Sequence, residues 1–100
     1  MAEAMPGFAP HELLEAAFAS CLNIWLRMHA NKHDIPLTGV KVTTRLDGMD
    51  DPERITFEYS FELEGPLQET HRQSLLAAAE LCPVRKTLSK MICFRKRDAA

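Results

Sequence analysis

The chain has 100 residues, of which 46% are hydrophobic, and it carries a formal net charge of −2. A chain of this length is expected to form one small domain, residues 1–100, that buries roughly 60 to 65% of its unfolded surface. Because the charge is near zero and no long run of like charge occurs, nucleic acid and an anionic membrane are excluded as expected partners.

The compartment is predicted from the first residues and from the cysteines. Residues 1–10 lack the cationic and apolar regions of a signal peptide, and the apolar run 16–26 is shorter than the roughly 20 residues that span a bilayer. Cysteines stand only at positions 21, 82 and 93, an odd number without Cys-x-x-Cys spacing. This pattern argues against a secreted disulfide framework and a zinc ribbon. We therefore expect a cytoplasmic protein with free thiols.

The first predicted element is a long helix over residues 10–31. Pro10 suits the first helical position, and Glu12 and Glu15 favour the positive end of the helix dipole. A rotation of 100° per residue gathers a broad set of apolar residues on one side, which is wider than one small sheet can cover. The excess predicts a homodimer. The residues on this predicted apolar face are Leu14, Phe18, Cys21, Trp25 and Met28.

Two strands are predicted to follow. Residues 40–46 and 54–64 alternate apolar and polar side chains, and turn residues lie between them at 47–53. A period of two is typical of strands with one buried and one wet face. The two segments are therefore expected to pair as an antiparallel hairpin.

The remaining pattern predicts helix over residues 67–82, a short helix and a closing strand. Pro83 disfavours helical geometry at Cys82, so the longer helix is expected to end there and the short one to begin at Pro83. The segment 91–97, Met-Ile-Cys-Phe-Arg-Lys-Arg, predicts a last strand. The order α-β-β-α-α-β indicates an α+β domain with an antiparallel sheet and a long central helix.

The local sequence gives Cys82 a reason to be reactive. As the cap of a helix starting at Pro83, its sulfur would lie near unpaired N–H groups, and Arg85 and Lys86 add positive charge. These surroundings favour thiolate over thiol. The alternative is a small residue that only packs beneath the helix junction. Cys21 has apolar helical neighbours and by itself indicates a core residue.

Three stretches together resemble the OsmC/Ohr family of osmotically induced and organic hydroperoxide resistance proteins. In residues 10–30 the motif Pro-x-Glu-Leu-Leu leads into Ala-Ser-Cys-Leu, residues 35–44 are also similar, and residues 75–89 hold Cys-Pro-Val before a short helix. The resemblance implies an OsmC-like fold and an intertwined homodimer in which two cysteines lie close together, across the subunit interface. It further implies that Cys21 attacks the hydroperoxide, that Cys82 resolves the sulfenic acid as a disulfide, and that an external dithiol reduces this disulfide.

The chain departs from the family pattern at the residues that assist the attacking cysteine. His11 occupies the position of the family's catalytic glutamate, and Glu12 stands one residue later. The family's arginine comes from a strand-rich segment before the long helix, whereas nine residues precede Pro10 here. Arg85 is the expected replacement cation. His11 is either a base or cation near a thiol or a solvated residue of the first turn.

Three functions follow from this interpretation. The first is a thiol-dependent peroxidase, an oxidoreductase with peroxiredoxin-like activity in the oxidative stress response, acting on organic hydroperoxides. The second is a non-catalytic OsmC-like dimer that senses redox state or binds a small molecule. The third is a shortened dimerisation module whose N-terminal part another chain supplies. No cofactor is expected, and no metal is assigned to His29, His33 or His71.

Overall fold

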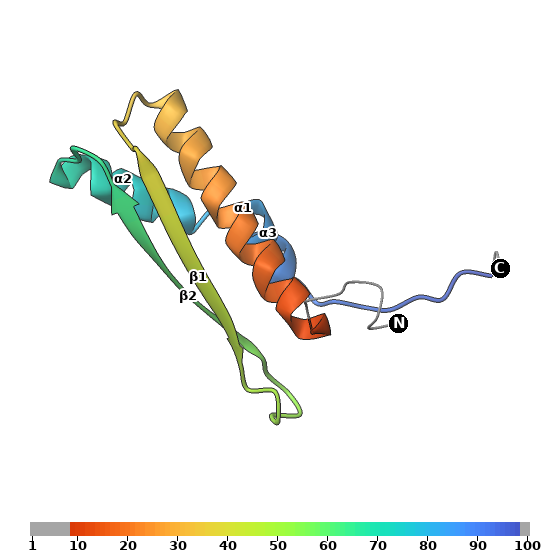
Figure 1. Ribbon diagram of the computed structural model, residues 1–100. Helices are drawn as coiled ribbons and strands as arrows, with labels where there is room; N and C mark the ends of the chain where they lie inside the picture. Colours follow the sequence, from red (N-terminus) through yellow and green to blue (C-terminus); the bar gives the residue numbers. More distant parts are fainter. Residues whose placement is uncertain (1–8, 99–100) are drawn as a thin grey trace.

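The computed structural model describes residues 9–98, which form a hairpin flanked by helices (Figure 1). α1 (Pro10–Lys32) is followed by the strands β1 (Gly39–Asp47) and β2 (Thr56–Glu64). α2 (Glu69–Ala79) and α3 (Pro83–Leu88) complete the elements. α1 packs against β1 and contacts both shorter helices, so it is the central element of the fold. None of the helices in residues 9–98 combines the length and the apolar character that crossing a bilayer requires.

The buried face of α1 differs from the predicted one. Leu14 is 45% exposed and Met28 is 59% exposed, although both were predicted to lie on the apolar face. The apolar sector of α1 is so wide that the sequence does not fix which part of it turns inward, and the hairpin and α2 select a different part. This choice leaves Leu14, Ile24 and Met28 uncovered. The side chains that α1 buries are spaced by four residues: Phe18, Leu22, Leu26 and Ala30.

The predicted hairpin is confirmed. β1 and β2 pair antiparallel, with Gly39 opposite Glu64 and Asp47 opposite Thr56. Along β2, half-buried and exposed residues alternate, as the period of two predicted. The ring of Phe18 on α1 packs edge-to-face with two aromatic rings of β2, with ring centroids 5.5 and 5.3 Å apart, which is a favourable aromatic geometry. The half-buried β2 residues are Phe57, Tyr59, Phe61 and Leu63.

Hydrogen bonds hold α1 in one position against its neighbours. The Glu15 carboxylate accepts the backbone N–H of Leu46 at 2.7 Å, and the Thr44 hydroxyl donates to the Glu15 carbonyl at 2.6 Å. On the other side of the helix, the Trp25 indole N–H donates to the Ala78 carbonyl of α2 at 2.7 Å. α1 is therefore anchored to both the hairpin and α2, which fixes the place of any residue in its middle turns.

The junction between α2 and α3 lies where Pro83 predicted it. α2 ends at Ala79, three residues before the predicted end, and Cys82 is the N-cap residue of α3 with Pro83 in the first turn. Leu75 and Ala78 bury α2 against α1. The junction places Cys82 inside the core, where it is fully buried.

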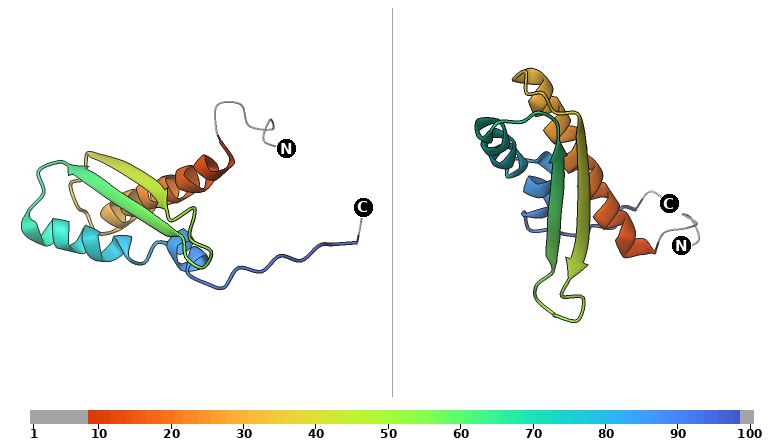
Figure 2. Two further views of the ribbon diagram at one scale, coloured as in Figure 1. Left: turned by 90° about the horizontal axis from the view of Figure 1, so that it is seen from below. Right: turned by 60° about the vertical axis from the view of Figure 1, so that its left-hand side comes forward.

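The prediction of a closing strand over residues 91–97 was wrong. The segment is extended but pairs with no strand among the described residues, and it runs away from the helices and the hairpin (Figures 1 and 2). Met91 is 90% exposed and Phe94 is 96% exposed. A strand forms only when another strand supplies hydrogen-bond partners, and alternation in the sequence does not reveal whether such a partner is present.

Candidate functional site

Two cysteines from distant parts of the sequence meet beneath α3. Cys21 lies in the middle of α1, and Cys82 lies between α2 and α3, 61 positions later. The Cys82 thiol donates to the Cys21 sulfur with an Sγ–Sγ distance of 3.2 Å. Both are free thiols, as is Cys93 in the exposed C-terminal segment. Because a disulfide bond is about 2.0 Å long, a shift of roughly 1 Å would join the pair.

The two thiols differ in exposure and in hydrogen bonding. Cys82 is 0% exposed, whereas Cys21 is half-buried. The backbone N–H of Val84, in the first turn of α3, acts to lower the pKa of Cys21. The side chain of Cys82 makes no capping hydrogen bond to α3. The N–H groups at the start of α3 therefore act on Cys21, whereas the sequence predicted that they would act on Cys82.

The balance of these surroundings disfavours the thiolate of Cys21. Burial raises the pKa of Cys21, and the adjoining Cys82, whose ionisation would place a second negative charge beside it, raises it further, while the N–H of Val84 opposes both effects. Among the described residues, no arginine, lysine, histidine or carboxylate makes a hydrogen bond to either sulfur. The activating cation that the family resemblance implied is therefore not seen in contact with Cys21.

The raised pKa of Cys21 predicts slow modification at neutral pH. Because the thiolate is the form that reacts, alkylation of Cys21 by iodoacetamide should accelerate with rising pH, with a midpoint above the value of about 8.5 for an unperturbed cysteine. Mass spectrometry of the cysteine peptides measures the rate at each pH, with the exposed Cys93 as internal reference. Labelling of Cys21 as fast as Cys93 at neutral pH would contradict this expectation.

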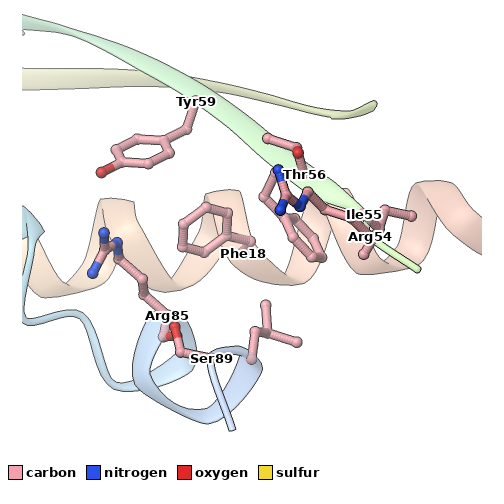
Figure 3. Close-up of a pocket in the computed structure, with 9 residues that line it drawn as sticks. Phe18, Arg54, Ile55, Thr56, Tyr59, Arg85 and Ser89 are labelled. Atoms are coloured by element: carbon pink, nitrogen blue, oxygen red, sulfur yellow. The ribbon is translucent and has the colours of Figure 1, made fainter. Parts of the chain in front are cut away.

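Arg85 points into a hollow between α1, β2 and α3 (Figure 3). The hollow has a volume of about 440 Å³. The Arg85 guanidinium donates to the Glu80 carbonyl at 3.2 Å, and the Tyr59 hydroxyl approaches the Glu80 carboxylate at 3.5 Å. Arg54 contributes a second cation to the same hollow. Its floor is apolar and aromatic, formed in part by Phe18, Phe57 and Leu88.

His11 and Glu12 lie in the first turn of α1, away from the two cysteines. Both are exposed, and the Glu12 carboxylate accepts the backbone N–H of Ala9 at 2.8 Å, which caps the helix. With a rise of 1.5 Å per residue, His11 stands roughly 15 Å from Cys21 along the helix axis. The structure therefore brings Cys21 and Cys82 together and leaves His11, Glu12 and Arg85 outside their hydrogen-bonding reach.

Sequence reasoning missed two features of the site. The Val84 N–H is a backbone group more than sixty positions from Cys21, and no sequence pattern points to such a contact. Arg54 and Tyr59 were treated only as strand residues, although both line the hollow that holds Arg85. The sequence signal for this hollow was an arginine at the start of a predicted strand whose inward-facing side chains are aromatic.

Comparison with known proteins gives a family match and similar structures. Residues 2–94 match the family model described as OsmC-like protein. The structure is similar to that of an OsmC-like protein from Mycoplasma pneumoniae, with a TM-score of 0.69 at 18% identity over 86% of this chain. It is also similar to an organic hydroperoxide resistance protein OsmC from Legionella pneumophila, with a TM-score of 0.67 at 25% identity over 85% of this chain.

A third similar structure covers the whole chain. It is an OsmC-like hydroperoxide resistance protein from Jannaschia, with a TM-score of 0.67 at 22% identity. The matches span 65% of the Mycoplasma chain, 64% of the Legionella chain and 70% of the Jannaschia chain. The present chain thus covers less than two thirds of the first two relatives. The comparison with curated proteins finds no match.

Proposed function

The chain belongs to the OsmC-like protein family, and from this premise we propose that it reduces organic hydroperoxides by thiol chemistry at Cys21 and Cys82. The observation that carries the proposal is the Sγ–Sγ distance of 3.2 Å between two free thiols. The thiols belong to segments 61 positions apart and meet in the core, where a reversible disulfide needs little movement.

The reaction that we propose begins at Cys21. Its thiolate attacks the outer oxygen of the hydroperoxide, the O–O bond breaks, and the organic part leaves as an alcohol after taking a proton. The sulfenic acid on Cys21 then condenses with the Cys82 thiol, which forms the disulfide and releases water. An external dithiol returns two electrons and two protons, and it becomes a disulfide itself.

The exposure of the two sulfurs supports this division of roles. A hydroperoxide reaches the half-buried Cys21 more easily than the fully buried Cys82. Once Cys21 is oxidised, Cys82 is already in contact and needs no access to solvent. The Val84 N–H, which acts to lower the pKa of Cys21, also stabilises negative charge on its sulfur.

The hollow next to α3 supports an organic rather than an inorganic peroxide. Its apolar floor offers a place for a hydrocarbon group, since burial of apolar surface is favourable. Phe18, which forms part of this floor, lies one helical turn before Cys21 on α1. We assign Arg85 the task of polarising the peroxide, which requires its guanidinium to leave the Glu80 carbonyl.

A hydroperoxide assay tests the proposed function. The parent protein, supplied with an alkyl hydroperoxide and a dithiol, should consume the peroxide at least about a hundredfold faster than Cys21→Ser, in the range for loss of an activated nucleophile. Cys93→Ser is the matched control, because Cys93 is exposed and lies outside the pair, and it should keep the parent rate. A parent rate no faster than that of Cys21→Ser would overturn the proposal.

The raised pKa of Cys21 favours a second candidate function. Among the described residues, no cation makes a hydrogen bond to either sulfur, so the pair is expected to form a disulfide slowly. Such a pair suits a redox sensor or a small-molecule-binding dimer that does not catalyse repeated peroxide reduction. In that case the parent and Cys21→Ser would consume peroxide equally slowly, while the parent alone would form a reversible disulfide.

We propose further that the protein acts as a homodimer in the cytoplasm. The stripe Leu14, Ile24 and Met28 on α1 and the apolar residues Met91 and Phe94 are all exposed in the single chain. Uncovered apolar surface of this kind is typical of interfaces. Light scattering at micromolar concentration should give the mass of two chains, and a stable monomer would contradict the dimer.

A further inference from the structure

Two histidines at the C-terminal end of α1 lie against each other with tilted rings, far from the cysteine pair. His29 and His33 are one helical turn apart, and their ring centroids lie 4.4 Å from each other at an interplanar angle of 44°. We propose that His29 and His33 form a two-imidazole binding site for a divalent transition metal such as Ni²⁺ or Zn²⁺. This site is independent of the proposed hydroperoxide chemistry.

Helix geometry brings the two imidazoles to one side of the chain. Residues four apart on an α-helix lie on the same face, so both imidazoles project to the same side. Pairs of histidines at this spacing supply two of the ligands in helical zinc sites. No metal was expected at these histidines from the sequence, and the helix predicted to end at residue 31 left His33 outside it. The structure shows the two rings already adjacent, so little conformational freedom is lost when an ion bridges them.

The surroundings of His29 fix its ring for this role. His29 is half-buried, and its Nε2 forms a 2.8 Å hydrogen bond with the Ser74 hydroxyl of α2. A metal-binding histidine commonly uses one ring nitrogen for such an orienting bond and the other for the ion. Nδ1 of His29 is therefore the nitrogen that remains for a metal.

His33 provides access from solvent. It is the exposed C-cap residue of α1, so an ion reaches its ring without any movement of the core. Within residues 9–98, no cluster of three or more histidine, cysteine, aspartate or glutamate side chains is placed to hold a metal. Water would fill the other coordination positions, which predicts an exchangeable site rather than a structural zinc site.

Imidazole ligands restrict the kind of ion. Nitrogen donors suit Zn²⁺, Cu²⁺ and Ni²⁺, whereas Mg²⁺ and Ca²⁺ require oxygen ligands. Ni²⁺ is the most suitable probe, because thiols compete strongly for zinc and copper and Cys93 is an exposed thiol.

Calorimetric titration with Ni²⁺ tests the site. His33→Gln should bind Ni²⁺ at least about tenfold more weakly than the parent, since loss of even an outer-shell partner costs 10 to 100-fold in metal affinity. His71→Gln is the matched control: it removes a histidine of the neighbouring helix whose Nδ1 accepts the Gln68 N–H, and it should leave the affinity unchanged. Equal affinity of the parent and His33→Gln would overturn the proposal, as would an equal loss in both variants.

A second measurement separates binding at this site from binding at the thiols. Ni²⁺ should raise the melting temperature of the parent, because a ligand that binds only the folded state stabilises it, and the shift should vanish in His33→Gln. His33 is exposed, so its replacement should not change the melting temperature without metal. A shift that persists in His33→Gln but disappears in Cys93→Ser would place the metal at the thiol and refute the histidine site.

Discussion

Cys82→Ser should change the product that a hydroperoxide leaves on the protein. One equivalent of an alkyl hydroperoxide, added without reductant, is expected to convert the parent to a Cys21–Cys82 disulfide, with the loss of two hydrogens from its mass. In the variant the hydroxyl of serine cannot resolve the sulfenic acid, so Cys21 should gain one oxygen and then react with dimedone. Mass spectrometry of the intact protein distinguishes the two products.

The same variant should also be far more sensitive to excess peroxide. A sulfenic acid that no neighbouring thiol traps proceeds to sulfinic acid, which a dithiol does not reverse. The parent is protected because Cys82 lies 3.2 Å from the Cys21 sulfur in the reduced pair and can trap its sulfenic acid. Cys93→Ser should behave as the parent does. Oxygen addition at Cys82 in Cys21→Ser would contradict the role of Cys21 as the attacking cysteine. A disulfide that includes Cys93 would contradict the role of Cys82 as the resolving cysteine.

Oxidation of the pair should make the fold considerably more stable. A disulfide between residues 61 positions apart removes loop entropy from the unfolded chain and is expected to add about 4 kcal/mol to the free energy of unfolding. In a domain of this size, a gain of that order corresponds to at least about 15 °C in melting temperature. Urea unfolding of the oxidised and the reduced protein measures the difference.

Two variants show whether the Cys21–Cys82 disulfide causes the gain. The oxidised and reduced forms of Cys82→Ser should unfold at the same urea concentration, whereas Cys93→Ser should keep the full difference. This test does not depend on any peroxide. A parent whose oxidised form is no more stable than its reduced form would show that the pair forms a disulfide only by straining the fold around α3.

The hairpin and the α2–α3 junction were predictable because local rules determine them. The alternation along β2 needs only one face to be buried, and Pro83 excludes helical geometry at Cys82 whatever the rest of the fold does. The orientation of α1 and the state of residues 91–97 were not predictable in the same way. The orientation of α1 and the state of residues 91–97 depend on the segments that pack against them. Neither the wide apolar sector of α1 nor the alternation in residues 91–97 reveals which segments those are.

At the candidate site, too, some features follow from the local sequence and others depend on tertiary contacts. The resemblance to the family placed Cys21 and Cys82 together across a subunit interface, whereas the structure has them in contact within one chain. The local argument identified the start of α3 as an activating group but attached it to the wrong sulfur, because the Val84 N–H reaches across to α1. Arg85 was judged by its distance along the sequence from Cys82, whereas the helical turn directs its side chain toward β2 (Figure 3).

The complete burial of Cys82 also gives the proposed regeneration step a fixed direction. An incoming thiolate must attack one sulfur of the disulfide in line and expel the other as leaving group. With Cys82 at 0% exposure, only the Cys21 sulfur is open to that approach. The mixed disulfide with a reductant should therefore form on Cys21 alone, and Cys82 should always be the leaving group. Selectivity among reductants then rests on the contacts that an incoming thiol makes around the half-buried Cys21.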